Sequence, residues 1–292
     1  MDTASETPTA SSTYSTAMRQ QYDAEIRNAP QDLLATFNNA VRGLSRGVVQ
    51  FRHPFEAKLH DIWYLLIEAA KHTDASSSLQ DSLVVQTLMA RQLADVGTQT
   101  SAGQNLWIDL PFLGADLEIA WHDLHNIHHG SDDDDDDNED NTRLEFKRNL
   151  VAFMARLFAT CDGPTALQDS LAACALEAFK NTLENQRTPD QLTSMLPIIN
   201  MWLQPAARKL AIFSSEQKQL SSAIPLGPLV EARSEGAPGA GFSPARWRHW
   251  TSRIKELAGS EDDEVKKLAQ AAGYWINEWM QTLNRAVTES LY

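Results

Sequence analysis

The sequence contains few of the residues that define several protein classes. Its 292 residues include only two cysteines, Cys161 and Cys174, which cannot form a disulfide framework. Both lie within apolar helical patterns, where a free thiol behaves as a small hydrophobic side chain. Twelve prolines and 13 glycines are too few for a low-complexity chain. We therefore expect a globular protein in a reducing compartment.

Long apolar runs are absent as well. The longest lies near residues 62–70, well short of the ~20 residues that a membrane-spanning helix needs. The first residues do not show a basic segment followed by an apolar one, so no secretory signal is expected. The sequence predicts a soluble protein in the cytoplasm or nucleus that is not secreted.

Basic residues are outnumbered, and the formal net charge is −14. Much of the excess comes from one acidic run, Asp132 to Asp137 with Glu139 and Asp140, and the remainder of the chain is only mildly acidic. An acidic surface disfavours nonspecific binding to nucleic acid or to anionic membranes. We expect neither as a partner, whereas a protein partner stays open and the oligomeric state is unknown.

Motifs for common catalytic mechanisms are missing too. The chain has no GxSxG segment, and neither cysteine has a recognisable catalytic context. The glycine-rich segment 236–241 lacks the lysine of a phosphate-binding loop. No catalytic residue and no cofactor are predicted, so the sequence leans against an enzyme without excluding one.

Apolar residues recur at the three-and-four spacing of one helical face, and no segment shows the alternation of a strand. The clearest faces are Phe55, Leu59, Ile62, Trp63, Leu66, Ile67 and Ala70; Val85, Leu88, Met89, Leu93 and Val96; and Leu113, Leu117, Ala120, Trp121, Leu124 and Ile127. The fold is predicted to be all-α, a single irregular bundle of roughly nine to ten helices. Residues 1–17 are expected to form a disordered tail. Residues 18–292 are expected to form one domain with flexible insertions near 130–141 and 225–241.

Three local signals predict where helices begin or break. Thr142 and Glu145 match a capping box, and Ser243 followed by Pro244 matches an N-cap. Pro197 and Pro205 interrupt an otherwise helical pattern, so a break or kink is expected at each.

The segment 241–250 combines aromatic and basic residues more densely than any other. Trp247 and Trp250 begin a stripe that continues through Ile254 and Leu257, as a buried helical seam requires. One interpretation is a core anchor, whose arginines pair with carboxylates of a neighbouring helix. The other is a binding surface formed by Arg246, Trp247, His249, Trp250 and Arg253.

A histidine cluster adjoins the acidic run. His122, His125 and His129 would lie on one helical face, and imidazoles at this spacing can bind zinc, nickel or copper. A polar helix end explains the same histidines, because they suit the negative end of the helix dipole. The three residues are only a weak metal candidate, and no metal is predicted.

Short aromatic motifs resemble those of a known family. They are Leu106-Trp107-Ile108-Asp109-Leu110-Pro111-Phe112, Gly241-Phe242-Ser243 and Arg246-Trp247-x-x-Trp250, with the apolar helix around residues 152–157. From about residue 55 onward the chain resembles the fungal proteins grouped as domain of unknown function 3632. The resemblance implies an all-helical intracellular fungal protein and supplies no catalytic residues. It also marks the aspartate run and the histidine cluster as an insertion of this chain.

Three functions remain for the structure to weigh. The first is a non-catalytic interaction or scaffold protein that acts through a groove between helices or an aromatic face. The alternative is a small-molecule binder or enzyme with a tryptophan-walled pocket lined by arginine or histidine. A third possibility, a metal-dependent hydrolase, requires His122, His125 and His129 around one ion.

Overall fold

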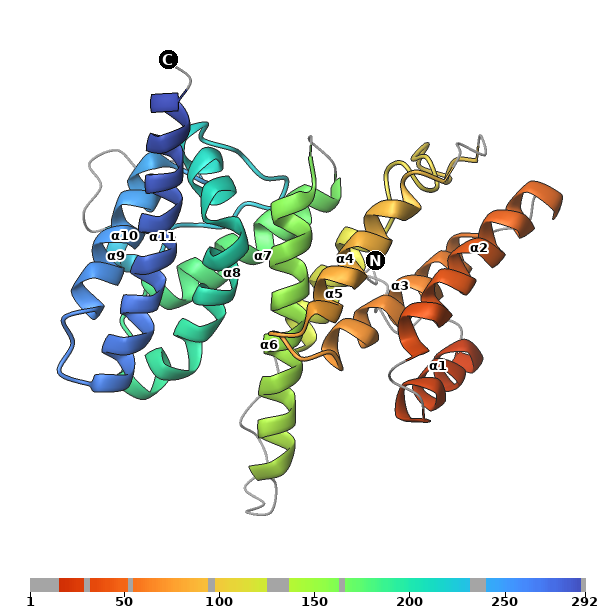
Figure 1. Ribbon diagram of the computed structural model, residues 1–292, viewed down its shortest axis with the longest axis horizontal. Helices are drawn as coiled ribbons and strands as arrows, with labels where there is room; N and C mark the ends of the chain where they lie inside the picture. The colour runs from red at the N-terminus through yellow and green to blue at the C-terminus, as the bar shows by residue number, and fades with distance from the viewer. Residues whose placement is uncertain are drawn as a thin grey trace, which may run out of the picture. The chain divides into compact units, whose positions relative to one another are not determined.

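The structure, a computed structural model, describes residues 16–28, 32–51, 55–93, 98–124, 137–162, 166–231 and 240–289. Within these ranges it contains eleven helices and no β-strand, which confirms the all-α prediction (Figure 1). None of the helices described there is both long and apolar enough to cross a membrane. The helices are α1 (Thr16–Asn28), α2 (Leu33–Phe51), α3 (Glu56–Lys71), α4 (Ser78–Ala90), α5 (Leu113–Asp123), α6 (Asp137–Thr160), α7 (Ala166–Leu183), α8 (Pro189–Ser215), α9 (Pro228–Glu231), α10 (Pro244–Leu257) and α11 (Asp263–Glu289).

Backbone contacts divide the chain into two compact units. The first consists of Met1–Phe153 with Thr165–Leu167, and the second of Met154–Pro164 with Gln168–Tyr292. The expectation that residues 18–292 form one domain stays a prediction. Of the expected tail, residues 1–15 lie outside the described ranges, as do residues 130–136 and 232–239 of the two expected insertions. The other parts of those insertions include the first turn of α6 and the short helix α9.

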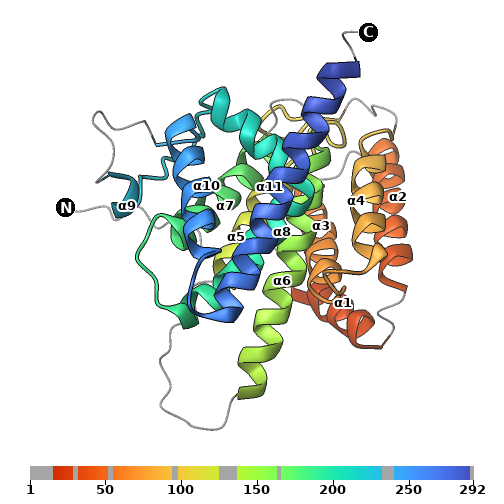
Figure 2. The same cartoon turned by 60° about the vertical axis from the view of Figure 1, so that its left-hand side comes forward.

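Helix α3 forms the centre of the first unit, and α1, α2, α4 and α5 pack against it (Figure 2). Its predicted apolar face is buried, and Trp63 is completely inaccessible to solvent. The Trp63 indole donates a hydrogen bond to the Pro111 carbonyl at 2.7 Å, and its ring meets Trp107 edge-on at 6.3 Å. The motif at 106–112 therefore packs into the core beside α3. Leu110 and Phe112, on either side of Pro111, have φ angles of 48° and 67°, a left-handed backbone that is unusual for non-glycine residues.

The buried face of α4 is not the one that the sequence predicted. Val85 and Met89 are about half exposed, at 51% and 50%, whereas Gln80 and Thr87 are completely buried. The Gln80 amide donates to three backbone carbonyls, and the Thr87 hydroxyl donates to the Leu83 carbonyl at 2.8 Å. These hydrogen bonds offset the cost of burying the Gln80 amide nitrogen and the Thr87 hydroxyl, whereas the Gln80 amide oxygen is buried without a hydrogen-bond partner among the described residues. Apolar and polar residues are both spread around α4 rather than gathered on separate faces, so periodicity could not choose between its faces.

Two further helix predictions differ from the structure, in the start of α6 and in the absence of a break in α8, while a kink at Pro197 or Pro205 stays a prediction. Helix α6 begins at Asp137, so Thr142 lies inside it and is not its cap. The acidic residues that precede Thr142 suit the positive end of the helix dipole, which explains the earlier start. Helix α8 runs unbroken from Pro189 to Ser215 through both internal prolines. Pro205 is exposed and Pro197 half-buried, so water can reach the carbonyls that lose their amide partners.

The second unit is built around α7, α8, α10 and α11, and α11 packs against both α8 and α10. A chain of ring contacts runs through its core. It links Trp202 to Phe158, Phe158 to Phe213, Phe213 to Phe242 and Phe242 to Trp250, each pair nearly perpendicular at 5.4 to 6.2 Å. Edge-to-face pairs of this kind are favourable beyond the area that they bury.

Candidate functional site

Helix α10 carries all five residues that the sequence singled out as a possible binding surface. Its start is as predicted, because the Ser243 side chain accepts a hydrogen bond from the Arg246 amide at 3.2 Å and Pro244 takes the first helical position. Arg246 and Trp250 are 0% exposed and His249 is 7% exposed. Trp247 and Arg253 are half-buried. One side of α10 is thus turned into the protein.

Arg246 uses all five of its guanidinium hydrogens inside the protein. Nε donates to Oε1 of Glu184 at 2.8 Å, and Nη2 donates to Oε2 of the same carboxylate at 3.0 Å. The remaining hydrogens go to backbone carbonyls, namely those of Ile224, Pro225 and Gly241 at 3.2, 3.2 and 2.9 Å. The two charges form a bidentate pair, the strongest arrangement of arginine with a carboxylate.

Glu184, the residue after the last turn of α7, is equally saturated. Beside the two bonds from Arg246, Oε1 accepts a hydrogen bond from the Trp250 indole and Oε2 accepts one from the Gly227 amide, both at 2.8 Å. Sequence reasoning anticipated a carboxylate partner for the arginines of α10 but did not identify this one. No local signal marks it, because it follows an apolar helix and lies 62 residues before Arg246.

Two further contacts fix the same junction. Nε2 of His249 lies 3.0 Å from the Leu183 carbonyl, within hydrogen-bond distance. The Leu229 amide donates to the Glu184 carbonyl at 3.0 Å. Gly227 passes so close that a Cβ atom there would lie 2.5 Å from Cβ of Glu184. The end of α7, the segment 224–229 and the start of α10 are therefore held together around one carboxylate.

This geometry favours the core-anchor interpretation for Arg246, His249 and Trp250. The Arg246 guanidinium, the Trp250 indole N–H and Nε2 of His249 serve internal contacts, whereas the buried Nδ1 of His249 has no hydrogen-bond partner among the described residues. Trp250 also packs against Phe179 with 4.8 Å between ring centroids. Arg253 pairs with Glu256 on its own helix at 2.5 Å. A ligand-binding role for the five residues stays a prediction.

The histidine cluster is only partly described. His122 lies in the last turn of α5 and is half-buried, whereas His125 and His129 lie outside the described residues. Across the part of the chain that the structure describes, no group of three histidine, cysteine, aspartate or glutamate residues could hold a metal ion.

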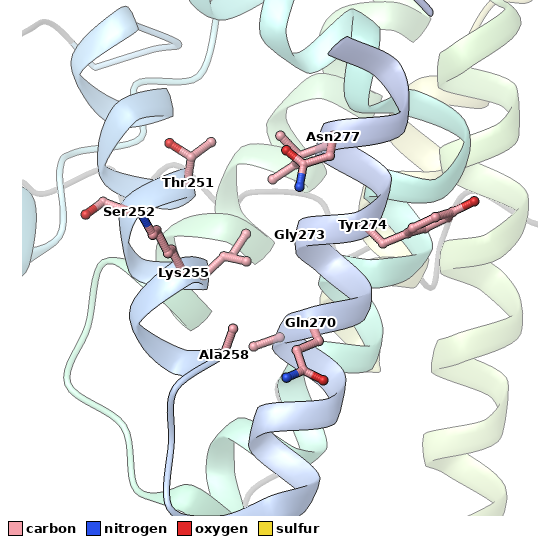
Figure 3. Close-up of a pocket in the computed structure, with 11 residues that line it drawn as sticks. Thr251, Ser252, Lys255, Ala258, Gln270, Gly273, Tyr274 and Asn277 are labelled. Atoms are coloured by element: carbon pink, nitrogen blue, oxygen red, sulfur yellow. The ribbon is translucent and has the colours of Figure 1, made fainter. Parts of the chain in front are cut away.

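An open groove lies between α10 and α11 in the second unit. It has a volume of about 890 Å³ and is hollow because small residues face it, namely Ala258 at the C-terminal cap of α10 with Ala269 and Gly273 on α11. Figure 3 shows Thr251, Ser252 and Lys255 along α10 opposite Gln270 and Asn277 of α11, while Tyr274 points away from α10. We call this feature the α10–α11 groove.

The chemistry of the α10–α11 groove suits binding rather than catalysis. Its polar lining consists of hydroxyl, amide and ammonium groups, and its apolar floor includes Ile254 and Ile276. The eleven lining residues include no histidine, cysteine, aspartate or glutamate, and Lys255 and Tyr274 are the titratable side chains among them. It also contains no tryptophan, unlike the pocket that the alternative function requires.

Comparison with known proteins agrees with the sequence motifs. A family model described as "Protein of unknown function (DUF3632)" matches residues 63–254. The Oxopyrrolidines biosynthesis cluster protein G of Penicillium oxalicum is 26% identical over an alignment of 242 residues that covers 73% of this chain and 62% of that protein. The chain thus spans less than two thirds of that relative's length. No solved structure matches.

Proposed function

The chain belongs to the DUF3632 family, and from this premise we propose that it is a non-catalytic interaction protein that binds a partner in the α10–α11 groove. The observation that supports the proposal most directly is the groove itself, which is open, mixed in polarity and without histidine, cysteine or carboxylate side chains in its lining. Its volume of about 890 Å³ lies within the range of natural binding sites.

The shape of the groove favours a short helical or extended segment of a partner protein. Its α10 side runs from Thr251 to Ala258, which is about two helical turns or ~10 Å. A partner helix would place two or three side chains along such a length, against the apolar floor. Lys255 is exposed at the rim and suits an acidic side chain of the partner.

The relative suggests where to look for the partner. Its printed name links that protein to an oxopyrrolidines biosynthesis cluster. For this chain we propose a partner of the corresponding kind, an enzyme of a biosynthetic pathway.

Site-specific crosslinking tests the proposal. A photo-crosslinking amino acid is placed at Lys255 or Gln270 in the groove, or at Lys267 of α11, whose side chain is 76% exposed and does not line the groove. After irradiation in the native cells, mass spectrometry identifies the crosslinked proteins. We expect the same protein at positions 255 and 270 and its absence at 267.

A second variant separates the interaction from its alternatives. A Cβ at Gly273 would meet only Ile254, at 4.0 Å, so the backbone tolerates a side chain there. Gly273→Leu should fill the groove and abolish the crosslink while the protein stays folded. Equal crosslinking at all three positions would refute the proposal. A small molecule extracted from the purified protein and lost in Gly273→Leu would instead support the small-molecule alternative.

A further inference from the structure

A second cavity in the same unit surrounds Lys209 of α8. Its volume is about 430 Å³, and its lining includes Asp162, Arg208, Ile212 and Phe213. None of these residues lines the α10–α11 groove, so an inference about this cavity does not rest on the function proposed above.

The amine of Lys209 is held at the end of α6. Nζ donates to the Phe158 carbonyl at 2.7 Å and to the Cys161 carbonyl, and it lies 4.9 Å from the centroid of the Phe158 ring. The Cys161 carbonyl also accepts a hydrogen bond from the buried Gln168 amide. The position of Nζ is therefore fixed by the backbone of another helix.

The number of acceptors matters for the protonation state. An ammonium has three N–H groups, whereas a neutral amine has two N–H groups and one lone pair. Among the described residues Nζ has two carbonyl acceptors, enough for the two N–H groups of the neutral amine, while the Phe158 ring beside it favours the ammonium. Burial lowers the pKa of Lys209 from its usual value, because it disfavours the charged form. The neutral amine is thus more populated here than at an exposed lysine.

We propose that Lys209 is a covalent binding site for small 2-oxo acids, which it holds as an imine within this cavity. Nζ supplies the nucleophile at a fixed position. Arg208, at the same cavity, supplies a cation for the carboxylate of the ligand, and Ile212 and Phe213 supply apolar contacts for its side chain.

The chemical step balances without an oxidant or a reductant. The Nζ lone pair attacks the carbonyl carbon, and the former carbonyl oxygen takes the proton that nitrogen loses, which gives a carbinolamine. Protonation of that hydroxyl lets it leave as water while nitrogen forms the double bond to carbon. Asp162 is exposed at the cavity and can relay the protons between these atoms and solvent.

Reductive trapping tests the proposal on the intact chain. The protein is incubated near neutral pH with glyoxylate, the smallest 2-oxo acid, and sodium cyanoborohydride, which supplies the hydride that converts the imine into a stable secondary amine. Peptide mass spectrometry then gives the labelling rate of each lysine. We expect Lys209 to react several-fold faster than exposed Lys255 and Lys267, because its lowered pKa raises the fraction of neutral amine.

Three outcomes decide the proposal. If Lys209 reacts no faster than Lys255 and Lys267, it serves only as a cap of α6 and the proposal is overturned. In Lys209→Arg, whose fold is checked by circular dichroism, the fast label should disappear. In Arg208→Gln, labelling of Lys209 by glyoxylate should fall several-fold while labelling by neutral acetaldehyde stays unchanged. An equal fall with both probes would overturn the preference for a carboxylate.

Discussion

Glu184 and Arg246 form a bidentate ion pair at 2.8 and 3.0 Å, and neither side chain is exposed to solvent. Every hydrogen-bonding position of the two groups that faces the protein is occupied, by Trp250, by the Gly227 amide and by three backbone carbonyls. A buried ion pair offsets the cost of leaving water only under such conditions. The pair therefore sets the position of α10, and with it one wall of the α10–α11 groove.

Breaking this pair from either side should destabilise the protein strongly. Glu184→Gln or Arg246→Met leaves an unpaired charge in the interior, so the free energy of unfolding should fall by ~3–5 kcal/mol. Denaturant unfolding measures the change. Arg248→Met, at an exposed position of the same helix, is the control and should stay within ~0.5 kcal/mol of the wild type. Similar losses for Arg246→Met and Arg248→Met would contradict the structure.

Gly227 should not tolerate even the smallest side chain. In Gly227→Ala the new Cβ would lie 2.5 Å from Cβ and 2.6 Å from the carbonyl oxygen of Glu184, so the backbone must shift and stability should fall by ~1–3 kcal/mol. Gly43→Ala in α2 is the matched control, because nothing lies within 4 Å of the added atom. There alanine should raise helix stability by up to ~1 kcal/mol. A shift of the two melting temperatures in the same direction would refute this assignment.

Two adjacent valines test which face of α4 is buried. Val84 is 4% exposed and Val85 is 51% exposed. Val84→Ala should lower the free energy of unfolding by ~1.5–3 kcal/mol, from lost burial and the cavity left behind. Val85→Ala should change it by less than ~0.5 kcal/mol. The reverse order in denaturant titrations would restore the face that the sequence predicted.

Lys209 should make stability depend on pH in the alkaline range. Its pKa in the folded protein is lowered from 10.5, so between that lowered value and 10.5 the unfolded chain binds more protons than the folded one. Stability from this group therefore rises with pH across the window and is constant below it. Lys209→Met should flatten the rise, whereas Lys267→Met at an exposed site should not. Denaturant midpoints of the two variants, measured from neutral pH to pH ~10, would show whether only Lys209→Met flattens the rise in stability. Identical pH profiles for the two variants would exclude a contribution from Lys209.

The single-domain expectation can be tested by calorimetry. Helix α6 contributes buried residues to both units, for example Phe153 to the first and Phe158 to the second. If the unfolding of α6 disrupts the hydrophobic core of both units, a calorimetric scan should show one unfolding transition. The van't Hoff and calorimetric enthalpies of that transition should then agree. Two separated transitions would show that the units unfold independently.

Local signals in the sequence predicted what depends on neighbours along the chain. The face of α3 around Trp63 and the cap at Ser243 follow from spacings of three to four residues, and both are found in the structure. The capping box at Thr142 shows where the same reasoning fails. The pattern of Thr142 and Glu145 matches a capping box, but the acidic residues before Thr142 favour an earlier start of α6. A capping box is found instead at the start of α8, between Thr188 and Gln191.

The segment around Trp247 and Trp250 shows the same division. Its spacing predicted a buried helical seam, and the structure buries Trp250 completely while leaving Trp247 half-exposed. The sequence could not reveal that Glu184 is the partner of Arg246, because that contact joins residues 62 positions apart. Nor could it locate the α10–α11 groove, whose hollow depends on Ala258 meeting Ala269 and Gly273 across two helices.

The sequence alone thus determined that this protein is helical and where most of its helices lie, because helix formation and capping are governed by contacts within a few residues. Its short aromatic motifs also determined which family it resembles. The tertiary structure alone decided which face of α4 is buried and which carboxylate neutralises Arg246. It also decided where small residues leave the α10–α11 groove and which residues line the cavity around Lys209. Those features arise when residues distant along the chain compete for the same interior space, and no local pattern records the outcome of that competition.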